Sequence, residues 1–166
     1  MKPYLLKIEQ INFSASALNP ALIEQHIHEF QEMISHISVP INFVAPAIDW
    51  MILKQRNEKI IDIINHNDYI QILPCTLTHV MLSQFFPHSV NFHFVREQLL
   101  WGSLILQSIF DQKKLSILWQ IPESDVTNEI AHILGEFTQF LIGPWIDFNL
   151  FSVDNTSVDS SKCYIG

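Results

Sequence analysis

Short apolar runs alternate along this chain with longer segments whose apolar residues recur every three or four positions. A short apolar run is typical of a buried strand, and the longer spacing is typical of a helix that packs on one face. Strands that alternate with helices form parallel pairs, because each connecting helix returns the chain to the same end of the sheet. We therefore expect an α/β fold with a mostly parallel sheet of five or six strands and with the helices outside.

The apolar runs predict the strands, and the periodic segments predict the helices. We expect strands at residues 4–13, 40–46, 68–73 and 113–120, with one or two more in 138–143 and 145–151. We expect helices at residues 20–37, 47–66, 90–110 and 126–134, the second with a break near 55–57. Residues 1–151 then form a single domain, and the polar, turn-rich residues 152–166 form a loosely held tail.

Composition is that of a globular protein and argues against two classes of partner. The 166 residues suffice for about one domain, and 48% of them are hydrophobic, which is enough for a core. The net charge is −8 and the nine basic residues are scattered, whereas nucleic-acid phosphates need clustered Lys and Arg. No apolar run approaches the roughly 18 residues of a membrane span. We expect no nucleic-acid partner and no membrane partner.

The amino-terminal segment and the cysteines indicate a reduced, cytoplasmic setting. Lys7 and Glu9 interrupt the first apolar residues, which therefore form no signal peptide. Cys75 and Cys163 show no Cys-x-x-Cys spacing, although one disulfide between them stays open. Cys75 and His79 are only a pair, whereas zinc needs three or four ligands, so we expect no metal. With four glycines and no phosphate-binding loop, we expect no cofactor.

Function in a parallel α/β fold is expected beyond the carboxyl ends of the strands, where ligands bind. Two residues at such positions carry chemistry, and each has a structural alternative. Glu123 follows the apolar run "ILWQIP", where it either faces a site or begins the next helix, whose dipole a carboxylate stabilises. His79, in "CTLTHVML", either contacts a ligand or is a partly buried histidine hydrogen-bonded to the backbone.

Other aromatic and histidine side chains also admit structural and functional interpretations. Three tryptophans either stack on sugars or lie in the core, namely Trp101, Trp119 and Trp145. Four acidic and histidine residues recur every four positions on the first predicted helix, namely Glu24, His28, Glu32 and His36. Their face lies opposite the apolar face of that helix, so we expect it to be exposed to solvent.

Three segments occur together in an order and at spacings that match a known family. They read "YIQILPCTLTHVML", "VREQLLWGSLILQSIF" and "LSILWQIPESDV". Together they resemble the catalytic barrel of glycoside hydrolase family fifty-seven, which acts on α-glucans. The likeness covers residues 40–142 and implies a carbohydrate-handling domain. It also implies that the five or six strands form a partial (β/α) barrel.

The resemblance implies roles for individual residues. Glu123 matches the family nucleophile, after Pro122 in the same segment. Gln98 matches a glutamine of the helix that precedes this segment. The residues that the resemblance implies for substrate binding are Gln71, Thr78, His79 and Trp119.

The chain also departs from the family pattern. The first strand, "KIEQINFSAS", contains no histidine where the family has one, and Gln71 stands where the family has a glutamate. The family's acid/base aspartate lies on a late strand, whereas this sequence ends at residue 166, soon after Glu123. Asp147, at the exit of a predicted strand, is the better substitute, because Asp125 is too close to Glu123 in sequence.

The missing aspartate leaves two functional hypotheses. Retaining hydrolysis needs two carboxyl groups about 5–5.5 Å apart, one that attacks and one that transfers protons. We therefore expect a truncated hydrolase-like domain that binds a glycan or serves in assembly without catalysis. The alternative is an active retaining glycosidase or glucanotransferase with Glu123 as nucleophile and Asp147 as acid. A partial barrel also leaves an open apolar side, which a second copy or another chain would cover.

Overall fold

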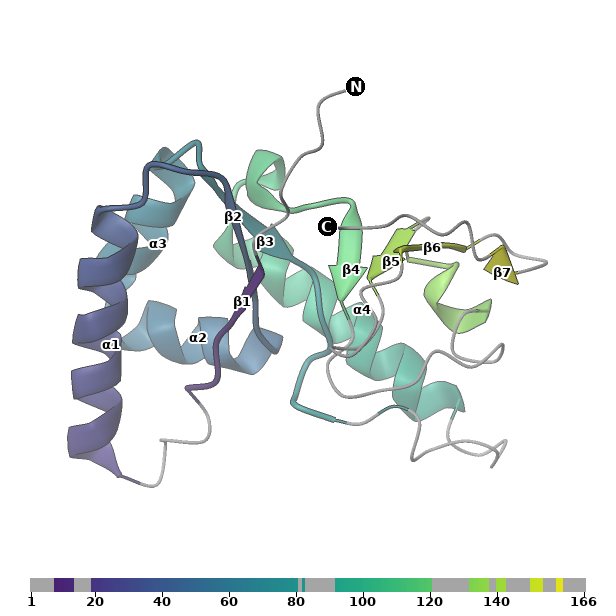
Figure 1. The fold of residues 1–166 in the computed structure, drawn as a ribbon. Coiled ribbons are helices and arrows are strands. Elements are labelled where there is room, and N and C mark those ends of the chain that lie inside the picture. The colour runs from purple at the N-terminus through teal and green to yellow at the C-terminus, as the bar shows by residue number, and fades with distance from the viewer. Residues whose placement is uncertain are drawn as a thin grey trace.

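Strands and helices alternate along the chain as far as β4 (Figure 1). The computed structural model describes residues 8–13, 19–80, 82, 92–120, 132–137, 140–142, 150–153 and 158–159. In chain order, its elements are β1 (Ile8–Gln10), α1 (Pro20–Ser35), β2 (Ile41–Val44), α2 (Ala47–Arg56), α3 (Glu58–His66), β3 (Ile70–Leu73), α4 (Phe92–Ile109), the short 3₁₀ helix η4 (Gln112–Lys114), β4 (Leu118–Gln120), β5 (Phe140–Ile142), β6 (Leu150–Val153) and β7 (Val158–Asp159).

The strands belong to two sheets rather than to one barrel. Strands β1, β2 and β3 form a parallel sheet in that order, and β4, β5, β6 and β7 form a second sheet. In the second sheet β4 and β5 are parallel, whereas the β5–β6 and β6–β7 pairs are antiparallel. An isolated parallel bridge between Ile72 and Leu115 links the sheets. The predicted partial barrel of five or six strands is therefore wrong.

The length of one connection explains why the strand direction reverses after β5. Residues 143–149 separate β5 from β6, whereas a parallel crossover needs roughly a dozen residues or more. The shorter connection returns the chain beside the strand that it has just left, which makes the pair antiparallel. Strand β7 and the end of β6 fall within residues 152–166. That residues 152–166 form a loosely held tail stays a prediction.

The helix boundaries follow local sequence signals. The Asn19 side chain accepts a hydrogen bond from the Leu22 amide at 3.4 Å. Helix α1 begins at Pro20, the first residue of the predicted helix. The predicted second helix is interrupted at Asn57, which separates α2 from α3. Helix α4 buries the face that its apolar spacing indicates, and its buried residues are Val95, Gln98, Leu99, Gly102, Leu106 and Ile109.

The main core lies between the first sheet and its helices. Phe43 and Ile72 are paired on neighbouring strands, and both are fully buried. The helix residues in the same cluster include Trp50, Ile64 and Leu106. Burying one side chain of this size contributes about 1.5–3 kcal/mol. This cluster is therefore the main source of stability in the described part of the chain.

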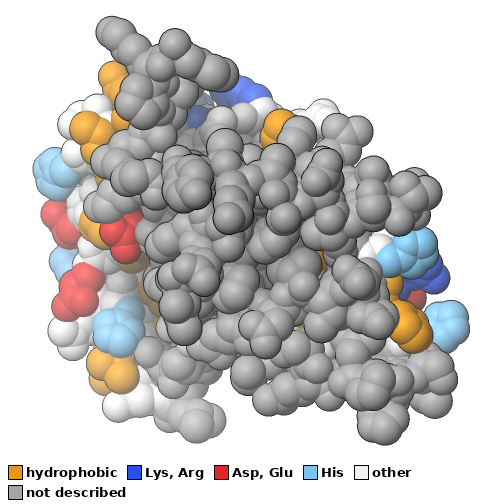
Figure 2. Space-filling model, turned by 45° about the vertical axis from the view of Figure 1, so that its right-hand side comes forward, with side chains coloured by type: hydrophobic (Ala, Val, Ile, Leu, Met, Phe, Trp, Pro, Cys, Tyr) orange, Lys and Arg blue, Asp and Glu red, His pale blue; other side chains and the backbone are white. Residues whose placement is uncertain are grey.

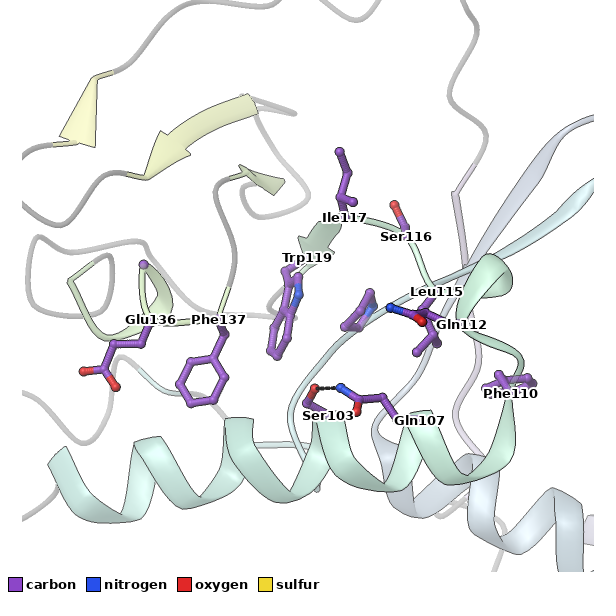
Figure 3. Close-up of a pocket in the computed structure, with 12 residues that line it drawn as sticks. Ser103, Gln107, Phe110, Gln112, Leu115, Ser116, Ile117, Trp119, Glu136 and Phe137 are labelled. Atoms are coloured by element: carbon purple, nitrogen blue, oxygen red, sulfur yellow. Dashed lines mark hydrogen bonds between the residues drawn. The ribbon is translucent and has the colours of Figure 1, made fainter.

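A smaller apolar cluster lies on the opposite face of the first sheet. It contains Val44, Leu73 and Cys75, and Leu118 of β4 packs against it. Because successive side chains of a strand point to opposite faces, the next residue, Trp119, points toward α4 (Figure 3). Strand β4 thus contributes to the small cluster on one side and to the space above α4 on the other.

The acidic and histidine stripe of α1 is exposed, as predicted. Figure 2 shows acidic and histidine side chains alternating down the edge of the molecule that α1 forms. Glu24, a member of the stripe, pairs with Arg56 of α2 at 3.2 Å. An exposed pair of this kind contributes little to stability. The stripe is a solvated helix face.

Candidate functional site

The segment that follows β3, residues 74–78, runs across the amino-terminal end of α2. The Thr76 carbonyl accepts a hydrogen bond from the Ala47 amide at 3.0 Å, and the Leu77 carbonyl accepts one from the Ile48 amide at 3.0 Å. Helix α2 begins after Pro46 and has no side-chain cap. Since the first amides of a helix have no partner within it, residues 74–78 serve as the missing cap.

Gln98 of α4 holds the same segment from the other side. Its side-chain oxygen accepts hydrogen bonds from the Thr78 amide and the Thr78 hydroxyl, both at 3.0 Å. Its backbone carbonyl accepts a third from the Leu77 amide at 2.9 Å. The resemblance matched both residues to family motifs, Thr78 as a substrate contact and Gln98 as a helix glutamine, and the two side chains lie in contact. Both Thr78 donors are occupied by Gln98, so the observed contact supports the loop, and a substrate contact by Thr78 stays a prediction.

Gly102 lets α4 approach residues 74–78 closely. A Cβ atom at this position would lie 2.7 Å from the Cys75 carbonyl oxygen and 2.9 Å from the Leu77 nitrogen. No function is predicted for Gly102 from the sequence. The signal was available, because a glycine inside a helix costs about 1 kcal/mol relative to alanine and often marks a close backbone approach.

Cys75 is wholly buried at the start of this segment. Burial raises the pKa of its thiol from 9.0 to about 11, and the nearby charge of Asp49 adds to the increase. The thiol is therefore protonated at neutral pH, which makes it a poor nucleophile and a poor metal ligand. Across the described ranges, no group of three or more His, Cys, Asp or Glu side chains is arranged to hold a metal ion.

The other predicted site residues are not gathered at one place. His79 is exposed after residues 74–78, and Gln71 is exposed in the middle of β3. Trp119 is buried, with 5% of its surface exposed, on the α4 side of β4. The two predicted catalytic carboxylates, Glu123 and Asp147, lie outside the described residues. Their roles therefore stay predictions.

A cavity of about 850 Å³ lies between α4, β4 and the turn at residues 135–137, and we call it the α4–β4 groove. Figure 3 shows it from the side, with α4 below and the Trp119 ring descending from β4. Twelve of the described residues line it, namely Pro74, Ser103, Gln107, Phe110, Gln112, Leu115, Ser116, Ile117, Trp119, Gly135, Glu136 and Phe137. Volumes of about 300–1,000 Å³ are usual for small-ligand sites.

The groove has a buried apolar floor and an exposed rim, which contains polar side chains and the apolar Ile117. Pro74, Phe110 and Trp119 are buried, whereas Gln107 and Gln112 are exposed. The Trp119 ring lies beside the Phe137 ring, with their centroids 5.8 Å apart and their planes tilted by 42°. The Gln107 side-chain amide donates a hydrogen bond to the Ser103 hydroxyl at 3.0 Å. Such a surface suits a ligand with both apolar and hydroxyl-bearing faces.

An ion pair fastens the turn at residues 135–137 to α4. Arg96 donates from Nε to Glu136 Oε2 at 2.9 Å, and its terminal nitrogen donates to Glu136 Oε1. This two-bond geometry is the favourable one for an Arg–carboxylate pair. The guanidinium lowers the pKa of the Glu136 carboxyl, chiefly through hydrogen bonding. Because Phe137 follows Glu136, the pair helps to hold the Phe137 ring beside Trp119.

Sequence reasoning identified Trp119 but missed the rest of the groove. Its walls come from α4, from the connection to β4 and from the turn at residues 135–137. Comparisons of the chain with family models, curated proteins and solved structures give no match. None of the helices in the described ranges combines the length and apolar character needed to cross a membrane.

Proposed function

We propose that this chain binds a carbohydrate in the α4–β4 groove and does not hydrolyse it unaided. The observation that carries the proposal is the composition of the groove, in which aromatic rings lie beneath a rim of amide and hydroxyl groups. The resemblance to an α-glucan-active family supports the same ligand class.

The chemistry of a sugar ring fits these groups. A pyranose has an apolar C–H face, which packs on an aromatic ring, and an edge of hydroxyl groups. Each hydroxyl both donates and accepts hydrogen bonds, as do the amides of Gln107 and Gln112 and the hydroxyl of Ser116. The partly exposed Phe137 ring and the small accessible part of Trp119 would contact the apolar face, while the rim side chains would bind the hydroxyl edge.

Binding without hydrolysis is the simpler form of the proposal. Retaining hydrolysis needs two carboxyl groups about 5–5.5 Å apart. Among the described residues that line the groove, Glu136 is the one carboxylate, and it is hydrogen-bonded to Arg96. A carboxylate held in this way is a poor proton donor, because its pKa is lowered. Hydrolysis through Glu123 is the alternative, and the test can detect it.

The test measures binding and sugar release together. Calorimetry with maltooligosaccharides should detect binding, and Gln107→Ala should weaken it by about threefold to tenfold through loss of one hydrogen bond. Gln55→Ala, which removes an exposed amide from α2, is the matched control and should bind as the wild type does. Absence of binding by the wild type would contradict the proposal. Sugar release that disappears in Glu123→Gln would contradict its non-catalytic part.

The proposal also covers compartment and assembly. A free, protonated Cys75 thiol supports a reducing compartment, for which we propose the cytoplasm. An assembly role has support in the exposed apolar side chains of α4, which are Phe94, Leu100, Trp101 and Leu104. The partner would be a second copy or another chain.

A further inference from the structure

We infer that the α4–β4 groove takes an uncharged saccharide and discriminates against saccharides that carry phosphate or carboxylate groups. This inference rests on the proposed function and specifies its ligand class. It comes from the charges of the described residues that line the groove rather than from its shape.

Among the residues that the structure describes, the lining of the groove offers an anion no cationic partner. None of the twelve described lining residues is Lys, Arg or His, and their one ionisable side chain is the acid Glu136. Phosphate and carboxylate groups are normally bound by Arg, Lys or helix amino termini. An anionic group placed on the buried Trp119 and Phe110 floor would lose its hydration without compensation.

The helix backbone beside the groove also disfavours anions. Ser103 and Gln107 lie in the carboxyl-terminal half of α4, and Phe110 follows its last residue. The carboxyl end of a helix carries partial negative charge, which disfavours anions nearby. The net charge of −8 over the whole chain adds a weaker, screened repulsion.

Cationic ligands are not favoured either, because the Glu136 carboxylate is already compensated. Both of its oxygens accept hydrogen bonds from Arg96, and the pair is about half exposed, with side-chain exposures of 37% and 47%. The groups left for a ligand are neutral amides and hydroxyls on the rim. These match the hydroxyl groups of an uncharged sugar.

The test compares maltotriose with maltotrionic acid, in which the reducing end is oxidised to a carboxylate. Calorimetry at pH 7 and low salt should show wild-type affinity for maltotriose roughly tenfold or more above that for the acid. Glu136→Gln uncouples the Arg96 guanidinium and should reduce this ratio by about twofold to fivefold. Glu97→Gln makes the same change in net charge elsewhere on α4 and should leave the ratio at its wild-type value.

The possible outcomes separate the inference from the proposed function. Equal affinities for the two saccharides, or tighter binding of the acid, would overturn the inference while carbohydrate binding stands. An equal change of the affinity ratio in Glu136→Gln and in Glu97→Gln would show that the discrimination does not arise at the groove. If neither saccharide binds the wild type, both the proposed function and the inference fail. Circular dichroism melting curves establish that each variant is folded.

Discussion

At the scale of single residues, Gly102 and Cys75 show how closely α4 and the segment after β3 are fitted. The backbone of residues 74–78 passes against α4 where a side chain larger than hydrogen would collide with the Cys75 carbonyl. The Cys75 side chain, pointing away into the small cluster, is excluded from water. Each of the two residues therefore leads to a separate prediction.

Gly102→Ala should destabilise the fold despite the higher helix propensity of alanine. The added Cβ would lie 2.7 Å from the Cys75 carbonyl oxygen, so α4 or the segment must move. Overpacking of this kind costs about 1–3 kcal/mol, whereas the gain in propensity is at most about 1 kcal/mol. Urea denaturation would measure the difference, with Ser108→Ala on the exposed side of α4 as a near-neutral control. A stability equal to that of the wild type would contradict the close approach.

The Cys75 thiol should make stability depend on pH above its ordinary pKa. Its pKa is 9.0 when exposed and about 11 in the fold, so the fold favours the protonated form. The resulting stability is complete below pH 9 and is lost as pH rises through 11, by about 1 kcal/mol between pH 9 and 10. Denaturation of the wild type and of Cys75→Ala over this range would compare the two slopes. Identical slopes would contradict the raised pKa.

At the scale of elements, η4 fixes the passage from α4 into β4. Its last residue, Lys114, is buried to 3% exposure although it is charged. The ammonium group donates to the Asn67 carbonyl at 2.6 Å and lies 3.8 Å from an Asp68 carboxylate oxygen. Because Asn67 and Asp68 precede β3, this contact ties the start of β3 to the start of β4 and so sets one end of the groove.

Lys114→Met should be destabilising, and Lys113→Met should not. The first change keeps the length of the side chain but leaves the Asn67 carbonyl without its partner, which costs about 1–3 kcal/mol. The second removes the same charge from an exposed neighbour, so its effect should stay within about 0.5 kcal/mol. Thermal melts of both variants would measure the two changes in stability. Equal melting temperatures would show that the buried ammonium is not a structural tie.

At the scale of the whole molecule, the local features could be predicted and the sheet pairing could not. The cap at Asn19 and the break at Asn57 depend on a few adjacent residues, which the sequence displays directly. The division into two sheets depends on pairing between distant strands. Residues 143–149 held a usable signal, since a connection that short excludes a parallel crossover. The resemblance to a barrel family outweighed this signal.

The candidate site divides in the same way. Thr78 and Gln98 were each matched to a family motif, but their hydrogen bonds depend on how α4 lies over the loop. Trp119 was predicted as a substrate-binding residue from the resemblance. Phe137 and Glu136 belong to no motif, and only the folded chain brings them beside α4.

The late capping of α2 has a consequence for synthesis on the ribosome. Helix α2 emerges first, yet the carbonyls that satisfy its leading amides belong to Thr76 and Leu77. Until those residues leave the exit tunnel, the helix start is open to water and frays readily. Translation of the segment after β3 therefore completes the amino-terminal end of a helix that was made earlier.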